Sequence, residues 1–76
     1  MTVDARDEIC PRPLLMAKNA LRKAGGGELI EVIVNDRTSK ENVVSYCYGS
    51  GDEVVRSWDE GTDFHFFIRK ASHPKS

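Results

Sequence analysis

The sequence predicts an α/β (α+β) fold: a two-layer sandwich in which two helices cover one face of a mixed four-stranded sheet, in the order β-α-β-α-β-β. Residues 28–34 (ELIEVIV) are the clearest strand, because this run is rich in β-branched residues. Alternation places Ile30, Val32 and Val34 on one face of the strand. Two other segments carry apolar residues at helical spacing, each on a single stripe. Since 76 residues supply only one hydrophobic core, both stripes must pack on the same sheet.

The first half of the chain predicts a strand, a helix and the central strand. Residues 1–5 (MTVDA) form a short strand. The first helix follows, with Cys10 as its cap and Pro11 at the first helical position, where the missing N–H costs nothing. Three consecutive glycines at 25–27 stop this helix. Its apolar stripe consists of Leu14, Ala17, Leu21 and Ala24, widened by Leu15.

The second half predicts a short helix and a hairpin. Thr38 and Glu41 have the spacing of a capping box, so we expect the second helix to begin there. Residues 53–58 (EVVRSW) and 64–70 (FHFFIRK) predict two strands joined through the polar stretch DEGT. Right-handed crossovers make the first three strands parallel and the last antiparallel. The second helix has the apolar residues Val43, Val44 and Cys47 and ends at Gly49 and Gly51.

Composition limits the classes of function. We expect one domain over residues 1–70 and a disordered tail over residues 71–76. A net charge of −1 disfavours direct nucleic-acid binding through the backbone. No apolar run approaches the roughly 18 residues of a membrane span and no signal peptide is evident, so we expect a cytoplasmic location. The two cysteines match neither a disulfide framework nor a zinc pattern; we expect free thiols, no metal and no cofactor.

Cys10 lies in the stretch EICPRPLL, directly before the first predicted helix. The first N–H groups of a helix are unpaired and carry roughly half a positive charge, which favours an anion at the cap. A thiolate is such an anion, so the pKa of this thiol is expected below the free value of about 8.5. Because Pro11 and Pro13 have no N–H, the N–H groups of Arg12 and Leu14 are the predicted donors to the sulfur.

Charged residues of both signs lie around this cysteine in the sequence. The acidic ones oppose a thiolate and the basic ones favour it. Since exposed charges are screened, we expect the fixed backbone dipole to decide whether the surroundings favour a thiolate. The set comprises Asp4, Arg6, Asp7, Glu8 and Arg12.

The pattern alone leaves two interpretations of Cys10 open. A cysteine at a strand-to-helix corner can be a small hydrophobic residue. Alternatively, the thiol is functional. The motif lacks the second cysteine of a C-x-x-C redox pair, and no local histidine signature marks a Cys/His hydrolase. An activated lone thiol can then hold a group covalently, such as a persulfide sulfur, and pass it on.

Three other side chains are weaker candidates. Cys47 lies on the apolar stripe of the second helix, so we expect a buried structural thiol too far from Cys10 for a disulfide. His65 alternates with two phenylalanines and therefore faces away from the core, where we expect a surface residue. His73 lies in the predicted tail.

The segment VDARDEICPRPLLMAKNAL, residues 3–21, resembles the signature of the TusA/SirA/YedF sulfur-carrier family. It has an Asp six residues before C-P-x-P and an apolar helix after it, and the likeness extends through NDRTSKENV to FFIRK. The resemblance implies the fold derived above. It also implies that Cys10 accepts a sulfane sulfur from a donor protein, such as a cysteine desulfurase or a rhodanese, and hands it to an acceptor protein. Such a carrier is of the sulfurtransferase type.

The resemblance carries over to individual residues. Pro11 and Pro13 are the motif prolines, and Asp4 is the matching acidic residue. Many members have glycine three residues before the cysteine, where this chain has Asp7. Glycine there indicates a positive φ, which Asp is among the few other residues to tolerate, so we expect the loop to be kept. We expect the added charge to bear on partner choice.

Alternative functions stay open. The fold could serve as a non-catalytic regulatory module that binds protein or RNA. NDRTSKENV looks closer to the YedF-like members linked to selenium metabolism, so the thiol could handle selenium. In either case Arg12, Arg6 and Arg37 are candidates to contact a partner.

Overall fold

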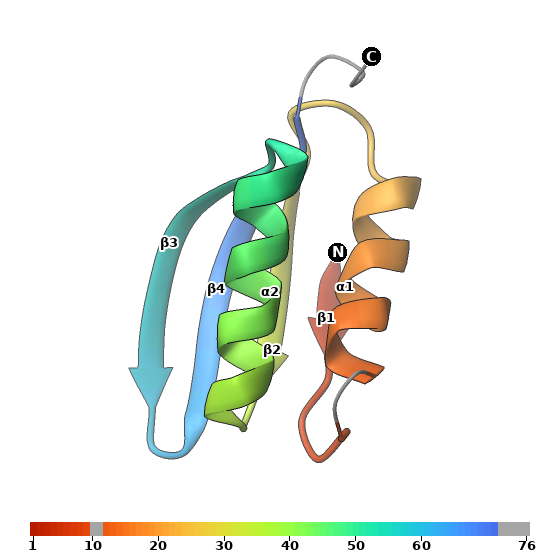
Figure 1. The fold of residues 1–76 in the computed structure, drawn as a ribbon. Coiled ribbons are helices and arrows are strands. Elements are labelled where there is room, and N and C mark those ends of the chain that lie inside the picture. Colours follow the sequence, from red (N-terminus) through yellow and green to blue (C-terminus); the bar gives the residue numbers. More distant parts are fainter. Residues whose placement is uncertain (10–11, 72–76) are drawn as a thin grey trace.

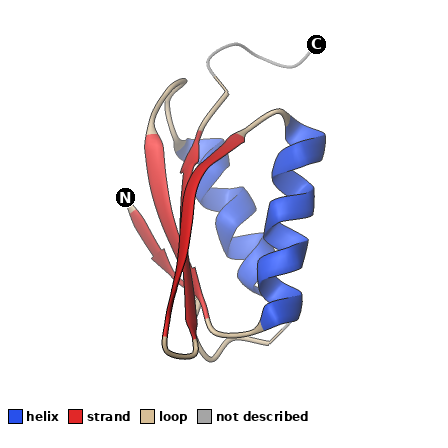
Figure 2. Ribbon diagram, turned by 90° about the vertical axis from the view of Figure 1, so that its left-hand side faces the viewer, coloured by secondary structure: helices blue, strands red, loops and turns tan. Residues whose placement is uncertain are grey.

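The computed structural model describes residues 1–9 and 12–71 and contains the six predicted elements in the predicted order. Both helices lie on one face of the sheet and the other face is open (Figures 1 and 2), so the two-layer sandwich is confirmed. Within the described residues, neither helix is long and apolar enough to cross a membrane. The elements are β1 (Thr2–Asp4), α1 (Arg12–Lys23), β2 (Leu29–Val34), α2 (Arg37–Ser50), β3 (Glu53–Glu60) and β4 (Asp63–Arg69).

The sheet has the strand order β1-β2-β4-β3. β1 pairs with β2 in parallel, and β4 pairs antiparallel with both β2 and β3. The first three strands therefore share one direction and only β4 runs against them, as the sequence predicted. A tight turn containing Gly61, with φ 62°, joins β3 to β4 and lets β4 fill the place beside β2. The inner position of β4 explains why its alternate residues are buried.

The core lies between the sheet and the two helices. Phe66 and Ile68 of β4 face the helices beside Ile30 and Val32 of β2, and all four are fully buried. Burying a side chain of this size stabilises the fold by about 1.5–3 kcal/mol. The remaining core side chains are Val3, Ala5, Ala17, Ala20, Leu21, Val34, Val43 and Cys47.

The buried stripe of α1 differs from the prediction at two positions. Ala17 and Leu21 are buried as expected, but Leu15 is 50% exposed and Ala20 lies inside instead. At 100° per residue, position 20 falls on the side of 13, 17 and 21, whereas position 15 points away from it. The prediction that Leu15 widens the core stripe was therefore wrong.

The start of α2 also differs from the prediction. The helix begins at Arg37, and Asp36 is its N-cap: the Ser39 N–H donates to Asp36 Oδ2 at 3.0 Å. Asp36 has the extended backbone of a cap residue, with φ −139° and ψ 131°. The prediction of a capping box at Thr38 was thus wrong, because the cap residue is Asp36, two positions earlier. Gly51 ends the helix in the left-handed conformation, with φ 86°.

His65 faces away from the helices, as predicted, but it is not a surface residue. It is only 9% exposed, because the Trp58 ring on β3 stacks on it with centroids 5.1 Å apart. Glu31 and Glu60 flank the imidazole: Nδ1 lies 3.4 Å from Glu31 Oε2, and Nε2 lies 3.1 Å from Glu60 Oε1. The contact with Glu60 lacks hydrogen-bond geometry. An open sheet face can therefore bury a polar residue under a neighbouring aromatic ring.

Candidate functional site

One edge of the molecule carries the candidate site. The chain leaves β1 and β2 at this edge, and both helices begin there (Figure 1, lower edge). The predicted nucleophile Cys10 and the motif residue Pro11 lie outside the described residues. The residues that flank them are described, so the site is defined by the loop at residues 5–9 and by the start of α1.

The first turn of α1 differs from the expected donor arrangement. The Arg12 N–H donates to the Ile9 carbonyl oxygen at 2.8 Å. The prediction that this N–H serves the sulfur was therefore wrong, because the loop carbonyl already accepts from it. That the Leu14 N–H donates to the sulfur stays a prediction. Pro13, the second motif proline, is fully buried in the first turn of α1.

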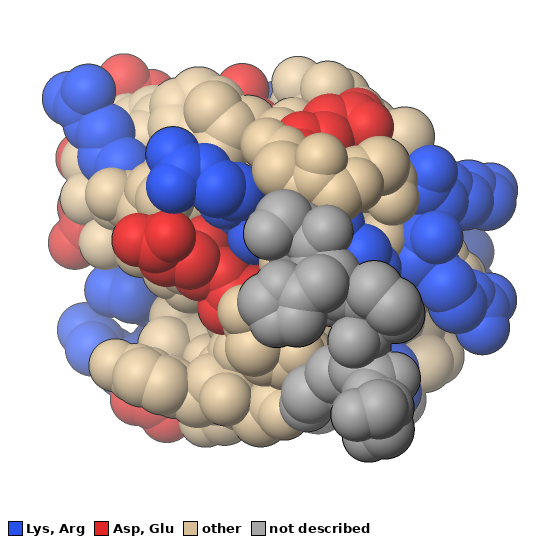
Figure 3. Space-filling model, turned by 90° about the horizontal axis from the view of Figure 1, so that it is seen from above, with Lys and Arg blue, Asp and Glu red and all other residues tan. Residues whose placement is uncertain are grey.

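The charge along α1 suits an anion at its start. Its first turn, counted from Arg12, contains no acidic residue, and its last turn carries Arg22 and Lys23. Cations at the C-terminal end complement the helix dipole and leave the positive end for an anion. Lys and Arg side chains gather on the side of the molecule where α1 lies (Figure 3).

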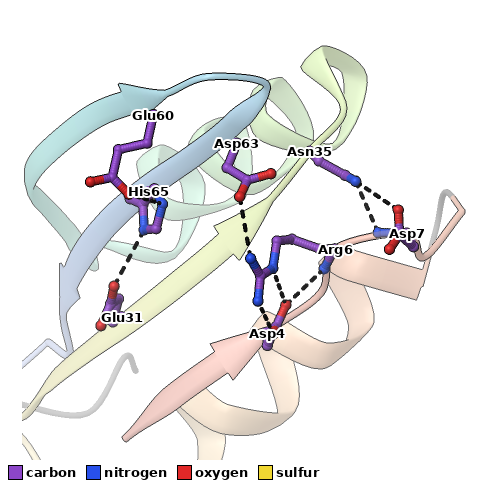
Figure 4. A network of polar contacts seen from close by, with 8 residues as sticks. All are labelled: Asp4, Arg6, Asp7, Glu31, Asn35, Glu60, Asp63 and His65. Atoms are coloured by element: carbon purple, nitrogen blue, oxygen red, sulfur yellow. Dashed lines mark hydrogen bonds and ion pairs between the residues drawn. The ribbon is translucent and has the colours of Figure 1, made fainter.

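Arg6 joins the loop to two strands. Its Nη2 lies 2.7 Å from Asp4 Oδ2 at the end of β1, and its Nη1 lies 3.3 Å from Asp63 Oδ2 at the start of β4 (Figure 4). The hydrogen bonds from Arg6 hold the pKa of Asp4 at about 2, below its usual 3.8. The same contacts, first with Asp4 and then with Asp63, raise the pKa of Arg6. The predicted residues Asp4 and Arg6 are therefore partners of each other.

Asp7 has the predicted positive φ, at 66°. Its N–H donates to Asn35 Oδ1 at 2.9 Å, and Asn35 Nδ2 donates to Asp7 Oδ1 at 2.8 Å (Figure 4). Asn35 follows directly after β2 and was not singled out in the sequence. Only the similarity of NDRTSKENV to family members pointed to this segment, and that signal did not name the asparagine.

Glu8, the third acidic residue between the end of β1 and the motif, pairs with Arg12: Arg12 Nε lies 3.1 Å from Glu8 Oε1. Asp4 pairs with Arg6 and Glu8 with Arg12, so two of the three acidic residues are offset by an arginine. Asp7 is held by a neutral amide instead. The two arginines offset part of the acidic charge, although Arg6 is shared with Asp63, and the helix dipole is the contribution that favours an anion at the start of α1.

The site has an open pocket of about 410 Å³ beside the loop. Arg37, the remaining predicted contact residue, lies at the start of α2 with its guanidinium 6.0 Å from the centroid of the Phe64 ring. No group of three His, Cys, Asp or Glu residues within ranges 1–9 and 12–71 is arranged to hold a metal ion. The pocket is lined by Asp4, Arg6, Asp7, Asn35 and Asp63.

Cys47 is buried, as predicted, at 1% exposure. It lies about 15 Å along α2 from Arg37, the first residue of that helix. Burial, with a smaller contribution from Asp52, raises its pKa from 9.0 to about 11. A thiol with this pKa is neutral under physiological conditions and is a poor nucleophile.

These features define a class of small two-layer α/β protein, in which a fastened loop leads through a Cys-Pro-x-Pro motif into the first helix. The chain belongs to the TusA family: the model of that family, described as Sulfurtransferase TusA, matches residues 1–70. The resemblance stated from the sequence is confirmed.

Individual relatives cover almost the whole chain. The sulfur carrier protein TusA of Allochromatium vinosum is 35% identical over 69 residues, which is 91% of either chain. The sulfur carrier protein TusA of Pseudomonas paraeruginosa is 31% identical over 68 residues, 90% of this chain and 86% of the relative. Among solved structures, a SirA-like protein from Desulfitobacterium hafniense superposes with a TM-score of 0.82 at 26% identity, covering 92% of this chain and 96% of that one.

Proposed function

We propose that this chain is a sulfur carrier that holds a sulfane sulfur as a persulfide on Cys10. The observation that carries the proposal is the family match over residues 1–70, which spans the Cys-Pro-x-Pro motif. The relatives from Allochromatium and Pseudomonas bear the name sulfur carrier protein, in agreement with this class of function.

The chemistry is a displacement without net oxidation. The Cys10 thiolate attacks the outer sulfur of a donor's persulfide. The donor's S–S bond breaks, its electron pair leaves with the donor cysteine as a thiolate, and a new S–S bond forms on Cys10. An acceptor's thiolate then attacks the outer sulfur on Cys10, and the Cys10 thiolate is released.

The start of α1 supports the anionic forms in this cycle. Unpaired N–H groups at a helix N-terminus favour both a thiolate and a persulfide anion. The pairs Asp4–Arg6 and Glu8–Arg12 reduce the negative electrostatic potential around the loop. Selectivity for one thiol follows from burial, because Cys47 lies in the core with its pKa raised to about 11.

The partners are a sulfur donor and a sulfur acceptor, both proteins. Apolar and cationic side chains are exposed around the motif: Ile9 is 82% exposed, Leu15 is 50% exposed, and the Arg12 side chain is 70% exposed. An acidic protein surface with an apolar centre fits this pattern. Arg12, which stays 70% exposed beside Glu8, and Arg37 are the proposed contacts, whereas Arg6 is held between Asp4 and Asp63. We place the carrier in the cytoplasm, where reducing conditions keep thiols available.

The test is transfer of labelled sulfur from a cysteine desulfurase or a rhodanese, through this chain, to a small-molecule thiol acceptor. The wild type is expected to relay the label and Cys10→Ala to relay none while remaining folded. A Cys10→Ala variant that relays label at the wild-type rate overturns the proposal. Folded wild-type protein that relays no label from either donor also overturns the proposal, and would favour a module that acts through surface contacts only.

A further inference from the structure

Two reciprocal hydrogen bonds fasten the loop at residues 5–9 to the sheet; we name them the Asp7–Asn35 clamp. The Asp7 N–H donates to Asn35 Oδ1 at 2.9 Å, and Asn35 Nδ2 donates to Asp7 Oδ1 at 2.8 Å (Figure 4). Asn35 lies between Val34, the last residue of β2, and Asp36, the cap of α2. Because it joins two regular elements, Asn35 is a rigid point of attachment for the loop.

The backbone at Asp7 needs such support. Asp7 is the one non-glycine residue with a positive φ in the part of the chain that the structure describes. A side chain in this left-handed conformation is strained, although Asp tolerates it better than most residues. Without the clamp, the 3.3 Å hydrogen bond from the Glu8 N–H to the Ala5 carbonyl oxygen is left to hold the turn, and the loop relaxes more readily toward negative φ. A change of φ at Asp7 alters the path by which the chain enters the motif, since Cys10 follows three residues later.

The clamp also fixes a charge. Asp4 and Glu8 are offset by arginines, whereas the Asp7 carboxylate accepts a hydrogen bond from a neutral amide. The clamp therefore determines where the Asp7 carboxylate lies within the loop.

We propose that Asp7 and Asn35 are positioning residues for Cys10, and that their clamp sets the reactivity of its thiol. The inference rests on the proposed function for its sulfur-transfer readout. Its second readout, the pH profile of Cys10 alkylation, needs no sulfur donor and tests the clamp independently.

Four variants separate geometry from charge. Asn35→Ala breaks the clamp and keeps the Asp7 charge. Asp7→Asn removes the charge and keeps the clamp, because the new amide oxygen accepts from Asn35 Nδ2. Asn35→Asp replaces the donor with a second carboxylate, and the double exchange Asp7→Asn with Asn35→Asp restores one donor and one acceptor. Thr62→Ala, in the exposed turn between β3 and β4, is the matched control.

Each variant is alkylated with iodoacetamide over a range of pH, and peptide mapping follows Cys10 separately from Cys47. Asn35→Ala and Asn35→Asp are expected to move the Cys10 profile to higher pH and to slow sulfur acceptance by about 10- to 100-fold, the range typical of a displaced reactive group. Asp7→Asn and the double exchange are expected to stay within about threefold of wild type, and Thr62→Ala to match it. Urea unfolding confirms that each variant is folded.

Wild-type profiles in Asn35→Ala and Asn35→Asp overturn the inference, as does a double exchange that recovers nothing over Asn35→Asp. A large change in Asp7→Asn with none in Asn35→Ala also overturns it, because charge and not the clamp would then govern the thiol. If the alkylation profiles shift as expected but wild-type protein accepts no sulfur, the clamp stands and the proposed function fails.

Discussion

The Trp58 indole stacks on the His65 imidazole with ring centroids 5.1 Å apart and ring planes 11° from parallel. His65 points away from the helices (Figure 4), and Trp58 is its register partner on β3, so the pair lies on the sheet face opposite the core. The Phe67 ring lies beside the indole, tilted by 37° with ring centroids 5.6 Å apart, and the Arg56 guanidinium lies 5.3 Å from the centroid of the Trp58 ring. This small aromatic group shields His65 and stabilises the two strands that carry it.

We expect Trp58→Ala to lower the free energy of unfolding by about 1–3 kcal/mol, because it removes the stacked ring and exposes a buried imidazole. Trp58→Phe should recover about half of the loss, since it keeps a ring over His65. Urea denaturation followed by circular dichroism measures both. Sulfur acceptance should be unchanged in the folded fraction. A Trp58→Ala protein as stable as wild type would show that the stacking contributes nothing.

Removing the cap of α2 is expected to destabilise the fold. Asp36→Ala leaves the Ser39 N–H without its acceptor, at an expected cost of about 1 kcal/mol, whereas Asp36→Ser should retain most of the stability. Thr38→Ala is the control and should change stability by less than about 0.5 kcal/mol. Thermal unfolding of the three variants ranks them. A larger loss in Thr38→Ala than in Asp36→Ala would restore the capping box predicted from the sequence.

Buried Cys47 gives a prediction for alkaline pH. Its pKa is raised from 9.0 to about 11 in the folded chain, so the unfolded state loses its proton first. The stabilising contribution is complete below about pH 9 and is lost as the pH rises to about 11. Wild type should therefore lose more stability than Cys47→Ala over this interval, as measured by urea denaturation at several pH values. Parallel losses in the two proteins would contradict the assignment.

At acid pH the pair of Asp4 and Arg6 gives the opposite dependence. The pKa of Asp4 is lowered from 3.8 to about 2, so the contribution of the pair is present above pH 3.8 and is lost as the pH falls toward 2. Arg6→Gln should return the carboxyl titration of Asp4, followed by carbon NMR, to near its ordinary value. Arg12→Gln is the control. An unchanged Asp4 titration in Arg6→Gln would exclude the ion pair as the cause.

Much of the fold followed from local pattern. The strand at residues 29–34 was predicted from its β-branched residues, and the hairpin from a glycine turn between two apolar runs. The positive φ of Asp7 was predicted because family members have glycine there. The strand and the hairpin depend on neighbours in the sequence, which is why local pattern was sufficient for them, whereas the φ of Asp7 was predicted from the family resemblance.

The features that were missed depend on contacts between distant segments. The burial of His65 requires Trp58 on the adjacent strand, and the clamp requires Asn35, which is far from Asp7 in the sequence. The start of α2 was missed for a different reason: Asp36 and Thr38 are both acceptable caps, and the choice between them depends on where β2 ends.

Intact-protein mass spectrometry tests the central claim most directly. The protein is incubated with a cysteine desulfurase and cysteine, or with a rhodanese and thiosulfate, in the absence of reductant. We expect wild type and Cys47→Ala to gain one sulfur atom that a thiol removes, and Cys10→Ala to gain none. No gain in folded wild-type protein from either donor, or a gain that persists in Cys10→Ala, would contradict a sulfur carrier that works through Cys10.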